Sequence, residues 1–267
     1  MPQHKTASGA QKPLIATRQQ GAVLIATIDP PEKRNALNDP CVFALEALFS
    51  NLPPDVKAVV LQGAGDHFCA GLDLSELSAR DVTEGIHHSM MWHRAFEKLQ
   101  FGRVPIVAVL KGAVIGGGLE LASATHIRVA EPTALYALPE GQRGIYVGGG
   151  ASVRLARIIG VDRMMDMMLT GRTYSAAEGL ALGISQYVVG DGEGPTKAIA
   201  LAERIAQNAG LTNFALIQAL PRIAESDRSA GFFTEALMAA IAQGDPEAKA
   251  RVKAFLDKKA GKITTST

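Results

Sequence analysis

Two glutamates lie at glycine-rich bends, and their setting suggests acid–base chemistry. Glu120 follows three consecutive glycines in AVIGGGLELA, residues 113–122, and stands between two leucines. Burying an ionised carboxylate is costly or raises its pKa, so Glu120 needs either a partner or a catalytic role. Glu140 follows a proline in LPEGQRG, at the end of a short apolar run. Structural explanations stay open, because an acidic side chain also suits a helix N-terminus and a turn carboxylate also suits water.

The same bends can supply hydrogen-bond donors. A glycine run before a helix lets the backbone approach a ligand, and the N–H groups of a helix N-terminus point outward. A second bend of this kind occurs in DHFCAGLDL, at Ala70 and Gly71. N–H groups from two bends that converge on one oxygen would stabilise negative charge developing there. Tight packing remains the alternative explanation, and no Lys-Ser/Thr pair follows the glycines as in a phosphate-binding P-loop.

Composition excludes several classes of function. The chain has 267 residues and a formal net charge of +1 with no basic block, which argues against nucleic acid as a partner. No apolar run reaches the ~20 residues of a membrane span, and the N-terminus lacks the apolar stretch of a signal peptide. Cys41 and Cys69 have neither metal-ligand spacing nor the density of a disulfide framework. We therefore expect reduced cysteines, no membrane partner and a cytoplasmic location.

The histidines do not predict a metal site. His87, His88 and His93 lie in a polar helical stretch, where we expect them to face solvent. The remaining histidines lack a second ligand at metal spacing.

The order of elements predicts an α/β fold. Residues 1–12 are polar and predict a disordered tail, and residues 14–29 predict two strands around Gln20 and Gly21. A pattern of strand, glycine, loop, glycine and helix then recurs three times, which indicates stacked strand–strand–helix turns. Amphipathic helices follow from about residue 160. We expect a core over residues 13–194 that carries the site and a helical region over residues 195–267.

Four segments in order carry a resemblance to a known family: GAGDHFCAGLDLSEL, KGAVIGGGLELA, YALPEGQRGIYVGGGASVRLARIIG and TGRTYSAAEGLALGISQYVV. Together they resemble the crotonase superfamily, specifically the enoyl-CoA hydratases, from about Leu14 to Ile263. The resemblance implies a crotonase-like spiral of stacked ββα turns and a C-terminal helical trimerisation region. It also implies an acyl-CoA thioester substrate, a homotrimer or dimer of trimers, and no separate cofactor, because coenzyme A is part of the substrate.

The resemblance assigns roles by motif. Glu120 and Glu140 match the paired catalytic glutamates of the hydratases, and Ala70 and Gly117 match the residues whose N–H groups form the oxyanion hole. The residues implied to bind substrate or CoA are Lys33, Arg34, Ala70, Gly71, Leu72, Asp73, Gly117, Phe255 and Lys258. Phe255 and Lys258 would reach the CoA of a neighbouring subunit. On spacing alone, the cations at 33 and 34 are equally well explained as solvated loop charges, and those near residue 258 suit a helix end.

The leading hypothesis is reversible addition of water across the 2,3 double bond of an enoyl-CoA. Isomerisation of the double bond, and hydration followed by carbon–carbon cleavage of an aromatic substrate, are alternatives on the same fold. Family members that catalyse these reactions often lack one of the two glutamates. A non-catalytic, RNA-associated relative is the alternative from another class. The loop 144–150 departs from the family because Val147 stands where a proline is usual. With Arg143 and Tyr146 it would border the acyl pocket, so the acyl group stays open.

Overall fold

The computed structural model describes residues 13–29, 31–73, 75 and 80–257, so the predicted tail at 1–12 and Lys258 lie outside the described residues. The described strands are β1 (Ile15–Gln20), β2 (Val23–Ile28), β3 (Ala58–Gly63), β4 (Ile106–Leu110), β5 (Ala113–Ile115), β6 (Ile127–Ala130), β7 (Leu135–Ala137), β8 (Thr173–Ser175) and β9 (Tyr187–Val188). The described α-helices are α1 (Asp39–Ser50), α2 (Val82–Gln100), α3 (Gly117–Ser123), α4 (Ala151–Ile159), α5 (Val161–Thr170), α6 (Ala176–Leu182), α7 (Gly194–Ala206), α8 (Gly210–Glu225), α9 (Arg228–Gly244) and α10 (Pro246–Leu256). The 3-10 helices η1 (Pro31–Lys33) and η3 (Gly141–Arg143) lie in loops of the described part of the chain.

Two sheets form the centre of the molecule. The larger sheet has the strand order β1-β2-β3-β4-β6-β9, and the smaller has the order β5-β7-β8. The first two strands form the expected hairpin, with Gly21 in the left-handed region at φ 56°. From β2 onward the strands of the larger sheet run parallel, which explains their nearly continuous apolar sequences.

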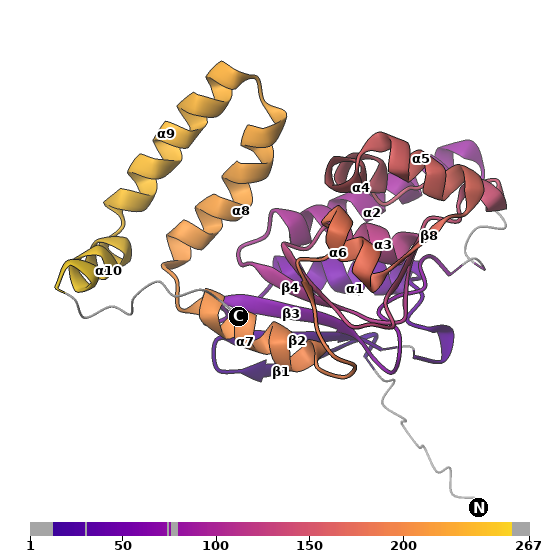
Figure 1. Cartoon of the computed structure of the whole chain (residues 1–267), viewed down its shortest axis with the longest axis horizontal. Coiled ribbons are helices and arrows are strands. Elements are labelled where there is room, and N and C mark those ends of the chain that lie inside the picture. The colour runs from indigo at the N-terminus through magenta and orange to yellow at the C-terminus, as the bar shows by residue number, and fades with distance from the viewer. Residues whose placement is uncertain (1–12, 30, 74, 76–79, 258–267) are drawn as a thin grey trace, which may run out of the picture.

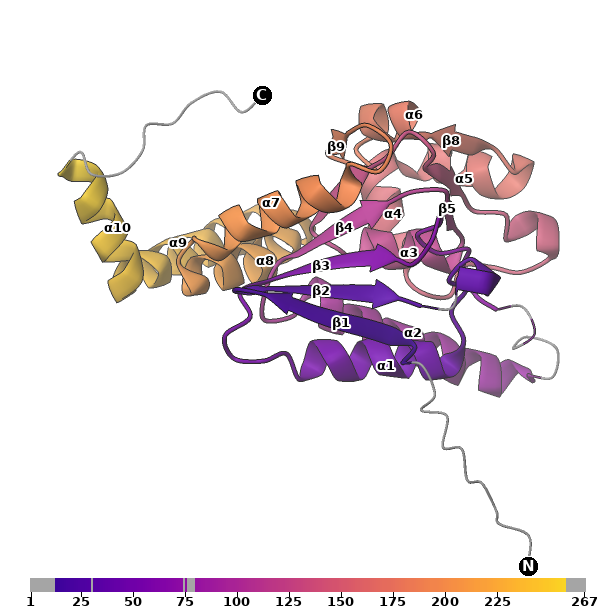
Figure 2. The same cartoon turned by 90° about the horizontal axis from the view of Figure 1, so that it is seen from below.

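Alternating side chains of the larger sheet enter two separate cores. In β2, Leu24 and Ile28 contribute to the main core, which also takes side chains from α1 and α2. Val23 and Ile25 point to the other face and pack with Ala198 and Ala202 of α7. Figures 1 and 2 show α1 and α2 along one face of the sheet and α7 along the other. Because successive side chains of a strand point to opposite faces, both faces of the sheet are packed against helices.

Successive turns of the chain add one strand to each sheet. β4 and β6 pair in the larger sheet, while the strands that follow them, β5 and β7, pair in the smaller one. An isolated parallel bridge between Cys69 and Val114 extends the smaller sheet toward the preceding turn. The glycine-rich bends of these turns are therefore stacked next to one another. This confirms the predicted strand–strand–helix turns.

The last helices leave this core. Figure 1 shows α8 and α9 as an antiparallel pair that projects away from the sheets, with α10 beside the end of the pair where α8 begins. None of the described helices has the length and apolar character required to cross a bilayer.

Candidate active site

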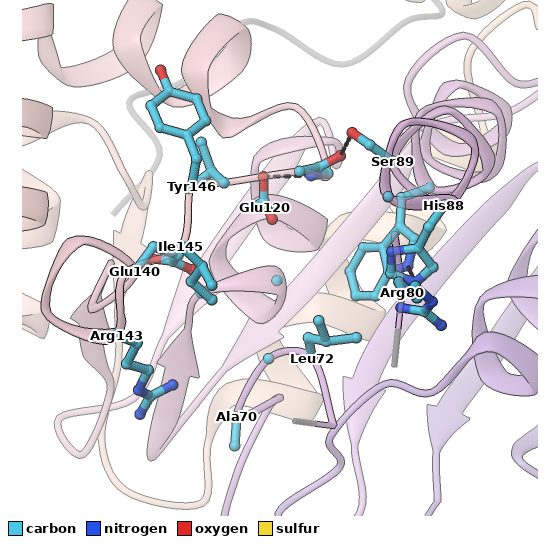
Figure 3. A pocket seen from close by; sticks show the side chains of 18 of the residues that line it. Ala70, Leu72, Arg80, His88, Ser89, Glu120, Glu140, Arg143, Ile145 and Tyr146 are labelled. Carbon is cyan, nitrogen blue, oxygen red and sulfur yellow. Dashed lines mark hydrogen bonds between the residues drawn. The ribbon is translucent and has the colours of Figure 1, made fainter. Parts of the chain in front are cut away.

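Both glutamates and both glycine-rich bends border one cavity of about 360 Å³. Gly117 and Glu120 reach it from the start of α3, Glu140 from the bend after β7, and Ala70 to Leu72 from the bend after β3. Figure 3 shows Glu120 and Glu140 on this cavity, with Leu72 and Ala70 at its lower edge. Three stacked turns therefore place four chemically useful groups around one space.

Glu120 is buried and held by main-chain donors. Its carboxylate Oε1 accepts hydrogen bonds from the N–H groups of Gly149 (2.8 Å) and Ala151 (3.0 Å), at the start of α4. Burial raises the pKa of Glu120, while these hydrogen bonds and the nearby Arg154 guanidinium oppose the rise. Glu120 thus has structural partners and still borders the cavity.

Glu140 has much less support. It is buried, and its Oε2 has no hydrogen-bond partner in the described part of the chain. Burial is the main cause that raises the pKa of Glu140 to about 7, and the charge of Glu120 raises it further. Its Oε1 lies against Gly116, where a Cβ atom would approach to 2.6 Å, so glycine is needed there for close packing as well as for the positive φ of 53°. This carboxyl can hold a proton near neutral pH.

The Ala70 N–H is not available to a ligand. It donates to the carbonyl oxygen of Arg34 at 3.0 Å, which contradicts the prediction that Ala70 is an oxyanion donor. The N–H groups of Leu72 and Gly117 have no acceptor among the described residues. They lie close together, because a Cβ atom built on Gly117 would be 3.3 Å from the Leu72 nitrogen. The free pair of donors is therefore Leu72 and Gly117.

A strained loop fixes the bend that carries Leu72. Arg34 and Asn35 both adopt positive φ, at 52° and 57°, which is uncommon outside glycine. The buried Asn35 side chain donates to the carbonyl oxygens of Ala64 (2.9 Å) and His67 (2.7 Å). Asn35 thereby joins the loop after β2 to the loop after β3, and the neighbouring Arg34 carbonyl receives the Ala70 N–H.

The chain is similar to known proteins over nearly its whole length. The sequence profile described as Enoyl-CoA hydratase/isomerase matches residues 18–264. The chain belongs to the enoyl-CoA hydratase/isomerase family. This confirms the predicted family and its enzyme class, that of the enoyl-CoA hydratases.

Individual relatives cover nearly the whole chain. Enoyl-CoA hydratase EchA19 of Mycobacterium tuberculosis is 30% identical over 93% of this chain and 95% of its own length. The short-chain-enoyl-CoA hydratase of Clostridium acetobutylicum is also 30% identical, over 92% of this chain and 95% of its own. A crystal structure of a provisionally assigned enoyl-CoA hydratase from Rhodopseudomonas palustris CGA009 is 59% identical, with a TM-score of 0.89 over 92% of this chain and 95% of that chain. The predicted crotonase-like fold is confirmed.

Of the residues predicted to bind CoA, some border the cavity and others lie away from it. Lys33 and Asp73 form an ion pair at 2.6 Å, which lowers the pKa of Asp73 to about 2. Arg34 is exposed in the same loop. Gly71 and Leu72 border the cavity itself. Phe255 is 59% exposed on α10, which Figure 2 shows far from α3 within this chain.

One group that borders the cavity was not predicted from the sequence. His88 was expected to face solvent, but its side chain is 13% exposed and borders the cavity, as do Ser89 and Arg80. The available signal was helical spacing, because His88 lies four residues before Trp92 and therefore on the same face of α2. The other two histidines of this helix, at 87 and 93, are exposed. No group of three or more His, Cys, Asp or Glu side chains within the described ranges could hold a metal ion.

Proposed function

We propose that this enzyme adds water reversibly across the 2,3 double bond of a 2-enoyl-CoA thioester to give a 3-hydroxyacyl-CoA. One observation carries the proposal: two free, adjacent N–H groups and two buried carboxyl groups border the same cavity. The donors suit a carbonyl oxygen that gains negative charge, and the carboxyl groups suit proton transfer to and from carbon and water.

The N–H groups of Leu72 and Gly117 form the proposed oxyanion hole. Hydrogen bonds to the thioester oxygen withdraw electrons from the conjugated double bond, so its β-carbon becomes electrophilic. When water attacks, the negative charge moves onto this oxygen as an enolate, where the two donors stabilise it. Leu72 replaces Ala70 in this role because the Ala70 N–H already has an acceptor.

The two glutamates divide the proton transfers in this proposal. The water oxygen bonds to the β-carbon and its proton passes to ionised Glu120, whose charge is supported by two main-chain N–H groups. Protonated Glu140 then gives its proton to the α-carbon as the enolate collapses to the thioester. The raised pKa of Glu140, about 7, favours the protonated form that this step needs. Proton exchange through solvent restores the pair.

We also propose a trimeric assembly through the helices after α7. α9 exposes large apolar side chains, namely Phe232, Phe233, Leu237 and Ile241. Contiguous exposed apolar side chains of this kind typically mark contact with another protein surface. Contact between copies would bury them and would give Phe255 a route to the CoA of a neighbouring subunit. A cytoplasmic location fits this function.

Glutamine variants of the two glutamates test the reaction. Turnover of crotonyl-CoA is followed by loss of the conjugated thioester absorbance, and the product is identified by mass. We expect a product heavier by one water and a loss of about 10² to 10⁴ in kcat for Glu120→Gln and Glu140→Gln, since general acid–base catalysis typically contributes that much. Glu97→Gln, on an exposed part of α2, serves as the control. Undiminished turnover in Glu120→Gln, or a product of unchanged mass, contradicts the proposal.

A further inference from the structure

A hydrogen-bonded trio of charged and polar side chains occupies one wall of the cavity. Asp39, at the start of α1, accepts from Arg80 through Oδ2 (2.8 Å) and contacts His88 Nε2 through Oδ1 (2.8 Å). Arg80 and His88 border the cavity, whereas Asp39 lies behind them. Figure 3 shows Arg80 and His88 on the opposite side of the cavity from Glu140 and Arg143. The proposed hydration chemistry uses none of these three groups.

The hydrogen-bond geometry orients His88 and leaves one ring nitrogen open. His88 Nε2 lies near both the Asp39 carboxylate and Trp92 Nε1, at 2.8 and 3.1 Å. It can donate to the first or accept from the second, but not both. A carboxylate is the stronger partner, so the hydrogen resides on Nε2 and points to Asp39. In the neutral ring Nδ1 is then an acceptor, and within the described residues it has no hydrogen-bond partner.

The rest of the cavity wall suits a carbon skeleton. Trp92, Ile145 and Val147 add apolar surface to its lining. The Trp92 ring packs against Gly117, where a Cβ atom would come within 2.8 Å of it, so the ring lies next to the proposed oxyanion hole. An acyl chain held by Gly117 would thus pass an aromatic wall before it meets the trio. A chain that ends in carbon would leave the Nδ1 acceptor of His88 without water or a partner, which is unfavourable.

We propose that the trio of Arg80, Asp39 and His88 selects a 2-enoyl-CoA whose acyl group carries a hydroxyl at its far end. This inference rests on the proposed hydratase function and names its substrate class. The hydroxyl donates its hydrogen to His88 Nδ1 and accepts from the Arg80 guanidinium. Sites that hydrogen-bond a substrate hydroxyl discriminate strongly against the analogue that lacks it.

The charges favour a hydroxyl over a carboxylate. Asp39 already balances Arg80, so this pair has no net charge to offer an anion. Asp81 also borders the cavity beside Arg80 and would repel a second carboxylate. Arg143 is the other cation on the cavity, but it lies across from the trio beside Glu140. A neutral group that both donates and accepts fits this wall.

Two pairs of esters, each pair differing by one hydroxyl, test the inference. One pair is 4-hydroxycinnamoyl-CoA and cinnamoyl-CoA, and the other is 6-hydroxyhex-2-enoyl-CoA and hex-2-enoyl-CoA. The readout is the ratio of kcat/KM within each pair. We expect the wild-type enzyme to favour the hydroxylated ester by at least about tenfold in one pair. The pair that shows the preference distinguishes an aromatic from an aliphatic acyl group.

His88→Phe removes the acceptor and keeps a ring against Trp92, so the preference should fall to near unity. His87→Phe is the matched control, because His87 is the exposed neighbour on the same helix and should keep the wild-type ratio. Equal kcat/KM within both wild-type pairs overturns the inference, and so does a preference that survives in His88→Phe. Crotonyl-CoA hydration by the wild type separates these results from failure of the proposed function, and the wild-type ratios need no variant to fold.

Discussion

Replacement of Gly117 by alanine tests whether its N–H and that of Leu72 act together on one oxygen. A Cβ atom at this position would lie 3.3 Å from the Leu72 nitrogen and 2.8 Å from the outer edge of the Trp92 ring. The methyl group would therefore crowd the two donors, where we propose that the thioester oxygen binds. Gly117 is absent from the residues with positive φ, so alanine meets no backbone strain there.

The expected loss follows from the number of donors blocked. Removal of a single oxyanion donor typically costs about 3 to 4 kcal/mol of transition-state stabilisation, or about 10² to 10³ in kcat. Because the methyl group obstructs both donors, Gly117→Ala should lose at least this much in kcat with crotonyl-CoA. The crowding against Trp92 should cost about 1 to 3 kcal/mol of unfolding free energy, since its ring edge can shift only slightly.

The assay pairs steady-state hydration with urea unfolding, so that lost activity is separated from lost structure. Gly85→Ala is the control: it adds the same methyl group to α2 at the edge of the cavity, where no atom lies within 4 Å of the added carbon. A Gly117→Ala protein that is folded and keeps kcat within tenfold of the wild type would refute the oxyanion hole proposed for Leu72 and Gly117.

Three further variants test other parts of the site. Glu140 keeps a proton up to about pH 7 in the folded state but releases it near the ordinary 4.5 when unfolded, so the wild type loses stability as pH rises through this range. In urea unfolding, the unfolding free energy of Glu140→Gln should rise relative to that of the wild type by about 3 kcal/mol from about pH 4 to about pH 8. A difference between the two proteins that stays constant with pH argues against the raised pKa. Asn35→Ala leaves two carbonyl groups without their donor and should lower the unfolding free energy by about 2 to 4 kcal/mol, with a fall in kcat; a loss below about 0.5 kcal/mol would mean that Asn35 does not fix the bend. Lys33→Ala should raise KM for crotonyl-CoA and leave KM for the pantetheine thioester unchanged, and an equal rise for both esters would exclude a contact with the nucleotide part of CoA.

The position of the two acids could be predicted because it depends on local chain features. Glycine runs between strand and helix allow few backbone paths, and their recurrence indicates turns that stack. Once the turns stack, Glu120 and Glu140 at corresponding bends must come near each other. The residue types and their spacing in the sequence are therefore enough to predict a paired-carboxylate site.

The choice between Ala70 and Leu72 could not be made from the sequence. Which N–H of a bend points to a ligand depends on the backbone rotation at Gly71, whose φ is 97°. It depends equally on a partner from far away in the sequence, the Arg34 carbonyl that accepts from Ala70. Neither the dihedral angle nor the long-range hydrogen bond leaves a pattern in the residue types.

The inward position of His88 could be predicted in part from the sequence. Trp92 and Phe96 follow it at intervals of four, and both are buried in the main core, so the helical period places His88 on the same side of α2. What the period does not reveal is the partner. Asp39 belongs to another helix, and only the packing of α1 against α2 brings its carboxylate within 2.8 Å of the imidazole.

The two glutamates differ in hydrogen bonding, and the difference favours Glu140 as the proposed acid. Donors on Glu120 stabilise its ionised form, and they come from the glycine-rich loop before α4. Similar donors on Glu140 would stabilise its ionised form as well, would lower its pKa below about 7 and would empty the proton site at neutral pH. The unpartnered Oε2 of Glu140 therefore lowers stability but keeps a transferable proton beside the substrate. A variant that supplied the missing hydrogen bond would make the fold more stable and would leave Glu140 without its proton at neutral pH.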